Sequence, residues 1–215
     1  MDNQSWKEKL AACAKAFSLN NFDTIIAKSA QEAAELVLAE ILLLTDGKVI
    51  SYGDSLTLRE TGILEVLKGN SRFTFLDGFS PERSREENLQ IRREALLSDI
   101  FLVGTNAVTM EGQLVNLDMI GNRIAPIVFG PSKVYAFVGR NKLVDNVGEA
   151  MDRIRNYAAP QNAIRHPKFK TPCQQTASCH NCKSPDRICN AWLITEKSFP
   201  KGRITVVLIN QDLGL

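Results

Sequence analysis

The sequence predicts an α/β fold with a mixed, mainly parallel sheet, helices on both faces of that sheet, and an irregular cysteine-rich segment near the C-terminus. Two observations lead to this prediction. Short apolar runs typical of buried strands alternate with segments of helical periodicity, which is the pattern of parallel sheets covered by helices. After residue 166 the alternation stops, and four cysteines follow in a stretch with neither period.

The composition is that of an ordinary globular protein. Apolar residues make up 44% and charged residues 23% of the 215 residues, and the formal net charge is +2. Such a small net charge gives no reason to expect nucleic acid or an anionic membrane as a partner, because both need clustered basic charge. The aliphatic runs at residues 41–44 and 206–209 are too short to cross a bilayer, which takes about 20 apolar residues.

The first residues predict an amphipathic helix, because Trp6, Leu10 and Phe17 recur at helical spacing between charged residues. A signal peptide would need a continuous apolar block instead, so we expect a cytoplasmic protein. A strand at residues 22–26 follows. Ser29, with Glu32 three residues later, then predicts a capping box at the start of a second helix.

Two further units of the same kind come next. A strand at residues 48–52 runs into a polar turn that opens a helical stretch through Leu67. A strand at residues 72–76 precedes Ser80-Pro81, where a capping hydroxyl and a first-turn proline predict a charged helix running to about Leu97.

In the second half the strands follow one another more closely. The expected strands are at residues 100–103, 113–117, 125–129, 133–138 and 203–209. Turn residues at Gly121-Asn122 and Gly130-Pro131-Ser132 suit antiparallel connections, so we expect the sheet to be mixed. Apolar residues from Val144 to Tyr157 share one face of a helix that should end near Ala159-Pro160.

These elements divide the chain into three parts. Residues 1–165 should form the main α/β domain, residues 166–192 a four-cysteine metal or cluster loop, and residues 193–215 a final strand that returns to the main domain. A structureless loop of this length is uncommon in a compact domain, so something other than a core should hold it.

The loop carries Cys173, Cys179, Cys182 and Cys189, with one Cys-x-x-Cys pair among them. Disulfides are rare in a reducing compartment, so we interpret the four as metal ligands rather than as reducible thiols or a disulfide in a flexible tail. Four thiolates suit a 4Fe-4S cluster or zinc. The spacing is neither a paired finger nor the dense ferredoxin run, and both remain open with a slight preference for iron-sulfur.

Neighbouring residues bear on this site. Lys170, Lys183 and Arg187 are expected to lower the cysteine pKa values. His166 and His180, which are the only histidines, could replace a sulfur, although a surface role is the commoner one. Cys13 lies on the apolar face of the first helix and is excluded.

Two loops that follow predicted strands could hold a small ligand, because loop amides and helix N-termini at the carboxyl ends of strands favour anions. The candidate binding residues are Gly53, Asp54, Ser55, Gly104, Thr105, Asn106 and Gly112. Neither loop has a phosphate-loop or dinucleotide pattern, so nucleotide binding is not expected. The alternative is that both are ordinary polar turns.

Four segments carry a family resemblance: Gly53-Asp54-Ser55, residues 98–107, residues 111–115 and residues 126–139. Taken in order, they resemble the LUD domain of lactate-utilisation proteins, of the lactate utilisation protein C type, over residues 15–160. That resemblance implies the fold shared by ribose-phosphate isomerase, glucosamine-phosphate deaminase and CoA transferases.

The resemblance also implies a functional context. Family members are associated with the oxidation of L-lactate, or a related hydroxy acid, to pyruvate beside iron-sulfur partner subunits, which makes a small hydroxy or keto acid the expected ligand. In CoA-transferase relatives a glutamate ahead of a glycine is the nucleophile, and Glu111-Gly112 lies in a comparable loop. Two alternatives follow: a CoA or acyl transferase-like enzyme that uses Glu111 with a structural zinc site, or a non-catalytic regulatory module. The sequence leaves the oligomeric state open.

Overall fold

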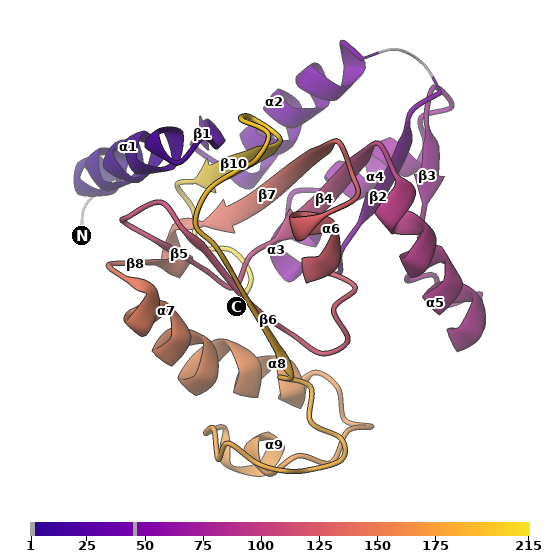
Figure 1. Cartoon of the computed structure of the whole chain (residues 1–215), viewed down its shortest axis with the longest axis vertical. Helices are drawn as coiled ribbons and strands as arrows, with labels where there is room; N and C mark the ends of the chain where they lie inside the picture. The colour runs from indigo at the N-terminus through magenta and orange to yellow at the C-terminus, as the bar shows by residue number, and fades with distance from the viewer. Residues whose placement is uncertain (1–2, 45–46) are drawn as a thin grey trace.

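The computed structural model describes residues 3–44 and 47–215, and its centre is a six-stranded parallel sheet (Figure 1). The strands are β1 (Asp23–Ala27), β2 (Val49–Tyr52), β3 (Thr74–Leu76), β4 (Ile100–Gly104), β7 (Lys133–Gly139) and β10 (Ile204–Ile209). They lie in the order β1-β10-β7-β4-β2-β3, and each neighbouring pair is parallel. Their carboxyl ends therefore meet at one edge of the sheet.

Helices cover both faces of this sheet, as the sequence predicts. One face carries α2 (Ala30–Leu42), α3 (Leu56–Glu60) and α4 (Ile63–Lys68); the other carries α1 (Asn3–Leu19) and α6 (Ile124–Val128). Successive strand residues point to opposite faces. Accordingly Ile100 and Leu102 join the first apolar cluster, whereas Phe101 and Val103 join the second.

A smaller sheet lies beyond the end of β4. Its strands are β8 (Leu143–Val144), β5 (Ala107–Thr109), β6 (Leu114–Asp118) and β9 (Ala191–Thr195), in that order. Strand β6 is antiparallel to both β5 and β9. A continuous helical run of α7 (Val147–Arg153), a π-helical turn (Ile154–Ala158) and α8 (Ala159–Ile164) packs on it through Ala150 and Ile154. The predicted mixed pairing is therefore real, but it occupies a separate sheet.

Two predicted helix starts have different outcomes. Ser29 caps α2 by accepting a hydrogen bond from the Glu32 amide at 3.2 Å, as predicted, but the capping box is incomplete because the Glu32 carboxylate accepts from the Lys28 amide rather than from that of Ser29. Ser80-Pro81 does not start a helix. The capping residue of α5 (Arg85–Glu94) is Ser84, which exchanges hydrogen bonds with Glu87 in a capping box, followed by a 3-10 turn to Leu97.

Other predictions were wrong in their details. Residues 125–129, predicted as a strand, lie largely in α6, because a short apolar run cannot be told from a buried helix by its period. The turns on either side of α6 therefore do not join antiparallel strands. The helical stretch through Leu67 is broken at Gly62, where φ is +73°. The helix predicted to end near Pro160 continues to Ile164, and Val144 lies in β8 rather than in that helix.

The cysteine segment is irregular apart from α9 (Pro172–Thr176), a short helix that the sequence period does not reveal. Strand β9, also not predicted, follows the segment directly and pairs with β6, so the segment is tied to the second sheet. In Figure 1 it forms the lowest part of the molecule, below α8. Among the described residues, no helix is long and apolar enough to cross a membrane.

Candidate functional site

A cleft of about 430 Å³ opens at the carboxyl ends of the central strands. One wall is built from the loops after β2 and β4, and includes Asp54, Ser55, Gly104, Thr105 and Asn106. The opposite wall comes from the π-helical turn, α8 and the residues that follow α8. The structure thus brings five of the seven candidate binding residues to one cleft, because β2 and β4 are neighbours in the sheet.

The two loops of the first wall lie against each other. Ser55 begins α3, and its hydroxyl accepts a hydrogen bond from the Leu58 amide at 3.4 Å. A Cβ atom on Gly104 would lie 2.0 Å from the Ser55 hydroxyl oxygen, so only glycine fits there. Gly53 is buried behind this wall, where a Cβ atom would lie 2.9 Å from Cγ of Arg123.

Arg123 holds the wall together. Its guanidinium donates five hydrogen bonds of 2.8–3.3 Å, and its side chain is 12% exposed. The acceptors are the side chains of Asn106, Asn116 and Asp118 and the backbone carbonyls of Gly104 and Leu117. All five N–H groups of the guanidinium are thereby used, so Arg123 positions the loop after β4 against β6 rather than binding a ligand.

The cleft is positively charged. Its carboxylates, Asp54 and Asp118, each lie in an ion pair with an arginine. Five further basic side chains line the cleft and form no ion pair with the described residues. One of them, Lys142, is nearly buried; we refer to the other four as the cleft cations: Arg85, Arg92, Arg165 and Lys168. They come from α5 and from the segment after α8, and so suit an anionic ligand held between the two.

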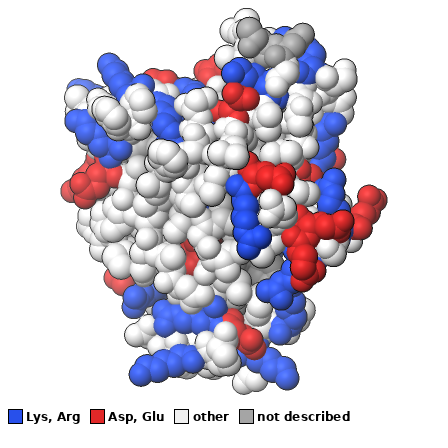
Figure 2. All heavy atoms as spheres, turned by 45° about the vertical axis from the view of Figure 1, so that its right-hand side comes forward, with Lys and Arg blue, Asp and Glu red and all other residues white. Residues whose placement is uncertain are grey.

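The pKa of His166 and the distribution of Lys and Arg side chains are consistent with a positively charged cleft. Burial lowers the pKa of His166, which also lines the cleft, and the positive charges of Arg165 and Lys168 lower it further. Figure 2 shows Lys and Arg side chains gathered at the lower end of the molecule, over the segment that contains α9. His166 therefore belongs to the cleft wall rather than to the cysteine site.

Lys142 is a cleft residue that the sequence analysis missed. It lies just beyond the carboxyl end of β7, is only 4% exposed, and donates hydrogen bonds to the Thr57 hydroxyl at 2.6 Å and the Thr105 carbonyl at 3.2 Å. Both acceptors are uncharged. The pKa of Lys142 is lowered to about 7, chiefly by burial and also by the positive charges of Arg153 and Arg123, while Glu60 opposes them.

This pKa makes the stability of the protein depend on pH. Between about pH 7 and the ordinary lysine pKa of 10.5, the unfolded chain holds a proton on Lys142 that the folded chain lacks, so stability rises with pH. Below this window both states are protonated, and the cost of burying the charge is fully present. We therefore expect the Lys142→Met variant to be more stable than the native chain near pH 6, with an advantage that shrinks toward pH 10. Urea unfolding across this range measures the difference, and a difference independent of pH would contradict the expectation.

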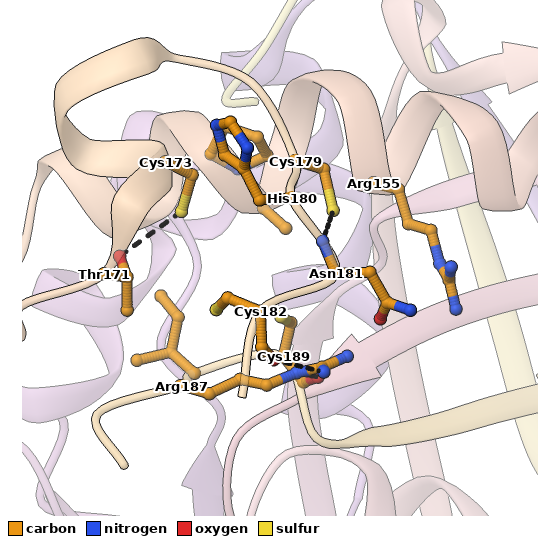
Figure 3. A pocket seen from close by; sticks show the side chains of 12 residues that line it. Arg155, Thr171, Cys173, Cys179, His180, Asn181, Cys182, Arg187 and Cys189 are labelled. Carbon is orange, nitrogen blue, oxygen red and sulfur yellow. Dashed lines mark hydrogen bonds between the residues drawn. The ribbon is translucent and has the colours of Figure 1, made fainter. Parts of the chain in front are cut away.

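The four cysteines of the C-terminal segment surround one small pocket. Cys173 is on α9, Cys179 and Cys182 are on the loop after it, and Cys189 precedes β9; all four line the pocket, and all are partly buried free thiols. Figure 3 shows their side chains arranged around a common space, with Arg187 running along one side. The structure therefore brings together all four residues expected to bind a metal.

Polar contacts fix this arrangement. The Cys179 sulfur accepts a hydrogen bond from the Asn181 amide at 3.4 Å, and the Thr171 hydroxyl lies 3.3 Å from the Cys173 sulfur. Arg187 donates to the carbonyls of Cys182 and Cys189 at 2.8 and 2.9 Å. His180 also lines the pocket, but its ring is hydrogen-bonded to Thr176.

The two kinds of metal site expected from the sequence need different arrangements of the four sulfurs. A zinc ion needs its four ligands about 2.3 Å from a single point. In the described part of the chain, no group of three or more His, Cys, Asp or Glu side chains is arranged in this way. An iron-sulfur cluster binds its cysteines through different iron atoms and so spreads the sulfurs more widely.

The expectation that basic neighbours lower the cysteine pKa values is not met at Cys189. Burial raises the pKa of this thiol, and Arg187 only partly opposes the effect. The reason is that Cys189 lies on the inner side of the segment, where it lines the large cleft as well as the cysteine pocket.

The cysteine pocket and the cleft are adjacent. Three residues, Ala159, Ile188 and Cys189, line both. The spacing of the cysteines does not reveal that the pocket and the cleft are adjacent, because the cleft wall and Cys189 belong to different parts of the sequence. Cys189 is the residue through which a group held by the cysteines would lie next to a ligand in the cleft.

Glu111 and Gly112 lie elsewhere. They form the turn between β5 and β6, where the Asn20 side chain donates to both carbonyls at 2.9 and 3.1 Å. Gly112 has φ +81° and packs against the backbone of α1, and Glu111 is exposed. Neither residue lines the cleft or the cysteine pocket.

Comparison with known proteins adds the family. A family model of the LUD domain matches residues 10–209. No curated protein matches the chain. The chain is similar to a solved DUF162 family protein from Deinococcus radiodurans, with 13% identity, a TM-score of 0.48, and coverage of 98% of this chain and 99% of the other.

Two further similar structures come from Pyrococcus horikoshii OT3. One is translation initiation factor eIF-2B, at 21% identity and a TM-score of 0.35, covering 56% of this chain and 50% of that one. The other is 5-methylthioribose 1-phosphate isomerase, at 14% identity and a TM-score of 0.40, covering 77% and 51%. Because the family model covers far more than half of the sequence, the chain belongs to the LUD-domain family, which is associated with lactate utilisation.

Proposed function

We propose that this protein binds a small hydroxy or keto acid in its basic cleft beside a 4Fe-4S cluster held by the four cysteines. In this proposal it works in the cytoplasm with iron-sulfur partner subunits, as an accessory protein in the oxidation of L-lactate, or a related hydroxy acid, to pyruvate. The observation that carries the proposal is that Cys189 lines both the cysteine pocket and the cleft.

The ligand class follows from the charge of the cleft. A small carboxylic acid would supply an anionic partner for the cleft cations, which form no ion pair with the described residues. Arg85 would approach it from α5 and Arg165 from the segment after α8. The Ser55 hydroxyl and the Asn106 amide line the first wall, where they could form hydrogen bonds with a hydroxyl or carbonyl oxygen. Glu111 does not line the cleft, so the proposal gives it no role.

The cluster would be held by Cys173, Cys179, Cys182 and Cys189, whose donor set of four thiols suits it. A cluster there would supply one-electron transfer. The chain itself positions these ligands through Arg187, Thr171 and the Asn181 amide, and it leaves only Cys189 on the cleft side.

Calorimetric titration of the anaerobically reconstituted protein with pyruvate and L-lactate tests the ligand class. Removing Arg85 and Arg165 together by alanine substitution should weaken binding by at least about tenfold to a hundredfold, since the loss of even one hydrogen bond to a charged group costs about 1.5–3 kcal/mol. A matched control that removes two positive charges away from the cleft, Lys7→Ala with Lys201→Ala, should bind as the native chain does. Failure of the native chain to bind either acid would refute this part of the proposal.

A further inference from the structure

The amine of Lys142 is an unusual feature of the cleft wall. It is nearly buried, yet it lines the cleft, and it forms no ion pair with the described residues. A structural lysine normally lies beside a carboxylate or keeps its ammonium group in water, because an unpaired buried charge is costly. The Glu60 carboxylate, the acidic group that acts on Lys142, instead accepts a hydrogen bond from the Gly214 amide.

The Lys142 nitrogen has three positions besides its bond to carbon, and its two hydrogen bonds occupy two of them. Two N–H groups face the Thr57 hydroxyl and the Thr105 carbonyl. The Thr57 hydroxyl can act as acceptor here because its own proton is directed to the Leu213 carbonyl at 3.2 Å. In the neutral amine the remaining position holds the lone pair, so the amine is arranged as a nucleophile on the cleft wall.

We propose that Lys142 captures the carbonyl carbon of a small keto acid in the cleft as a covalent imine. The step balances without an oxidant or a reductant. The nitrogen lone pair forms a bond to the carbonyl carbon, the carbonyl π electrons move to oxygen, and proton transfer from nitrogen gives a carbinolamine. Loss of the hydroxyl group with the remaining N–H proton then gives the C=N bond and one molecule of water.

The charged residues around Lys142 suit a keto acid. The imine of a keto acid keeps its carboxylate, and the cleft cations offer that carboxylate unpaired positive charge. Burial, together with the positive charges of Arg153 and Arg123, disfavours the protonated amine and leaves a substantial neutral fraction near neutral pH. This inference rests on the proposed function, because it assumes that the cleft binds a keto acid.

Borohydride trapping tests the inference. The full-length chain is incubated with pyruvate and sodium borohydride, digested, and analysed by mass spectrometry for the reduced pyruvyl adduct. We expect labelling of the peptide that contains Lys142, approaching one adduct per chain, and none with L-lactate, which has no carbonyl carbon to attack. The labelling rate should increase from about pH 6 to about pH 8 as the amine loses its proton.

Two variants and one control separate the outcomes. Lys142→Arg and Lys142→Met should both lose the adduct, and the methionine variant covers the case in which arginine does not fit the buried position. Lys201→Arg, which changes an exposed lysine outside the cleft, should keep it. No Lys142 adduct in a chain that binds pyruvate by calorimetry, or labelling spread evenly over surface lysines, would overturn the inference alone. A chain that does not bind pyruvate would overturn both it and the proposed ligand class.

Discussion

Replacing Cys179 and Cys182 together by alanine is expected to reduce the iron content of the anaerobically purified protein from about four atoms per chain to near zero, with loss of its visible absorption. These residues supply two of the four sulfurs around the pocket, including the one that accepts the Asn181 amide. With two ligands left, a cluster of this type has no stable attachment. Iron and sulfide analysis with a visible spectrum makes the measurement.

The fifth cysteine provides the matched control. Cys13 is a buried thiol on α1 whose pKa is raised by burial, and it lies outside the pocket. Cys13→Ala should therefore keep the full iron content. Equal loss of iron in both proteins would contradict the assignment of ligands. About one zinc per native chain without colour would instead make the segment a structural zinc site, as the sequence alone also allows.

Replacing Arg123 by leucine is expected to lower the free energy of unfolding by about 3–5 kcal/mol, because it removes one partner of a nearly buried ion pair. The change leaves the Asp118 carboxylate without its cation and removes donors from the amide oxygens of Asn106 and Asn116. Urea unfolding measures the loss. Because Arg123 also holds the loop after β4 against β6, pyruvate binding should weaken in the same variant.

Arg59→Leu is the control for this prediction. Arg59 forms an ion pair with Asp54 at a similar distance, 2.9 Å, but its side chain is 51% exposed. Exposed pairs contribute less than about 1 kcal/mol, so this variant should unfold almost as the native chain does. Similar losses in the two variants would show that burial of the Arg123 pair is not what stabilises the wall.

Much of the fold could be predicted from local patterns. The central strands of the main sheet are short apolar runs, because they are buried on both faces, and Ser29 marks the start of its helix by a capping contact with an amide three residues away. The loops after β2 and β4 could be expected to meet because parallel neighbours place their carboxyl ends together. Segment 125–129 could not be assigned, because five apolar residues fit a buried strand and a buried helix equally well.

The missing parts of the site depend on contacts distant in sequence. Lys142 is 85 positions from Thr57, the residue that accepts its shortest hydrogen bond. Its place after the strand at residues 133–138 was the available signal, since the rule that selected the other two loops applies to this strand as well. The role of Arg123 and the position of Cys189 between pocket and cleft arise from the packing of the second sheet against the main one, which no short pattern encodes.

Electron paramagnetic resonance of the reduced, anaerobically reconstituted chain tests most directly whether the proposed cluster lies next to the ligand in the cleft. Spectra are recorded with and without saturating pyruvate, and again for the Arg85→Ala, Arg165→Ala double variant. We expect a cluster signal whose line shape changes when pyruvate binds to the native chain and changes less in the double variant. A spectrum without a cluster signal, or one unchanged by pyruvate that calorimetry shows to be bound, would contradict the account.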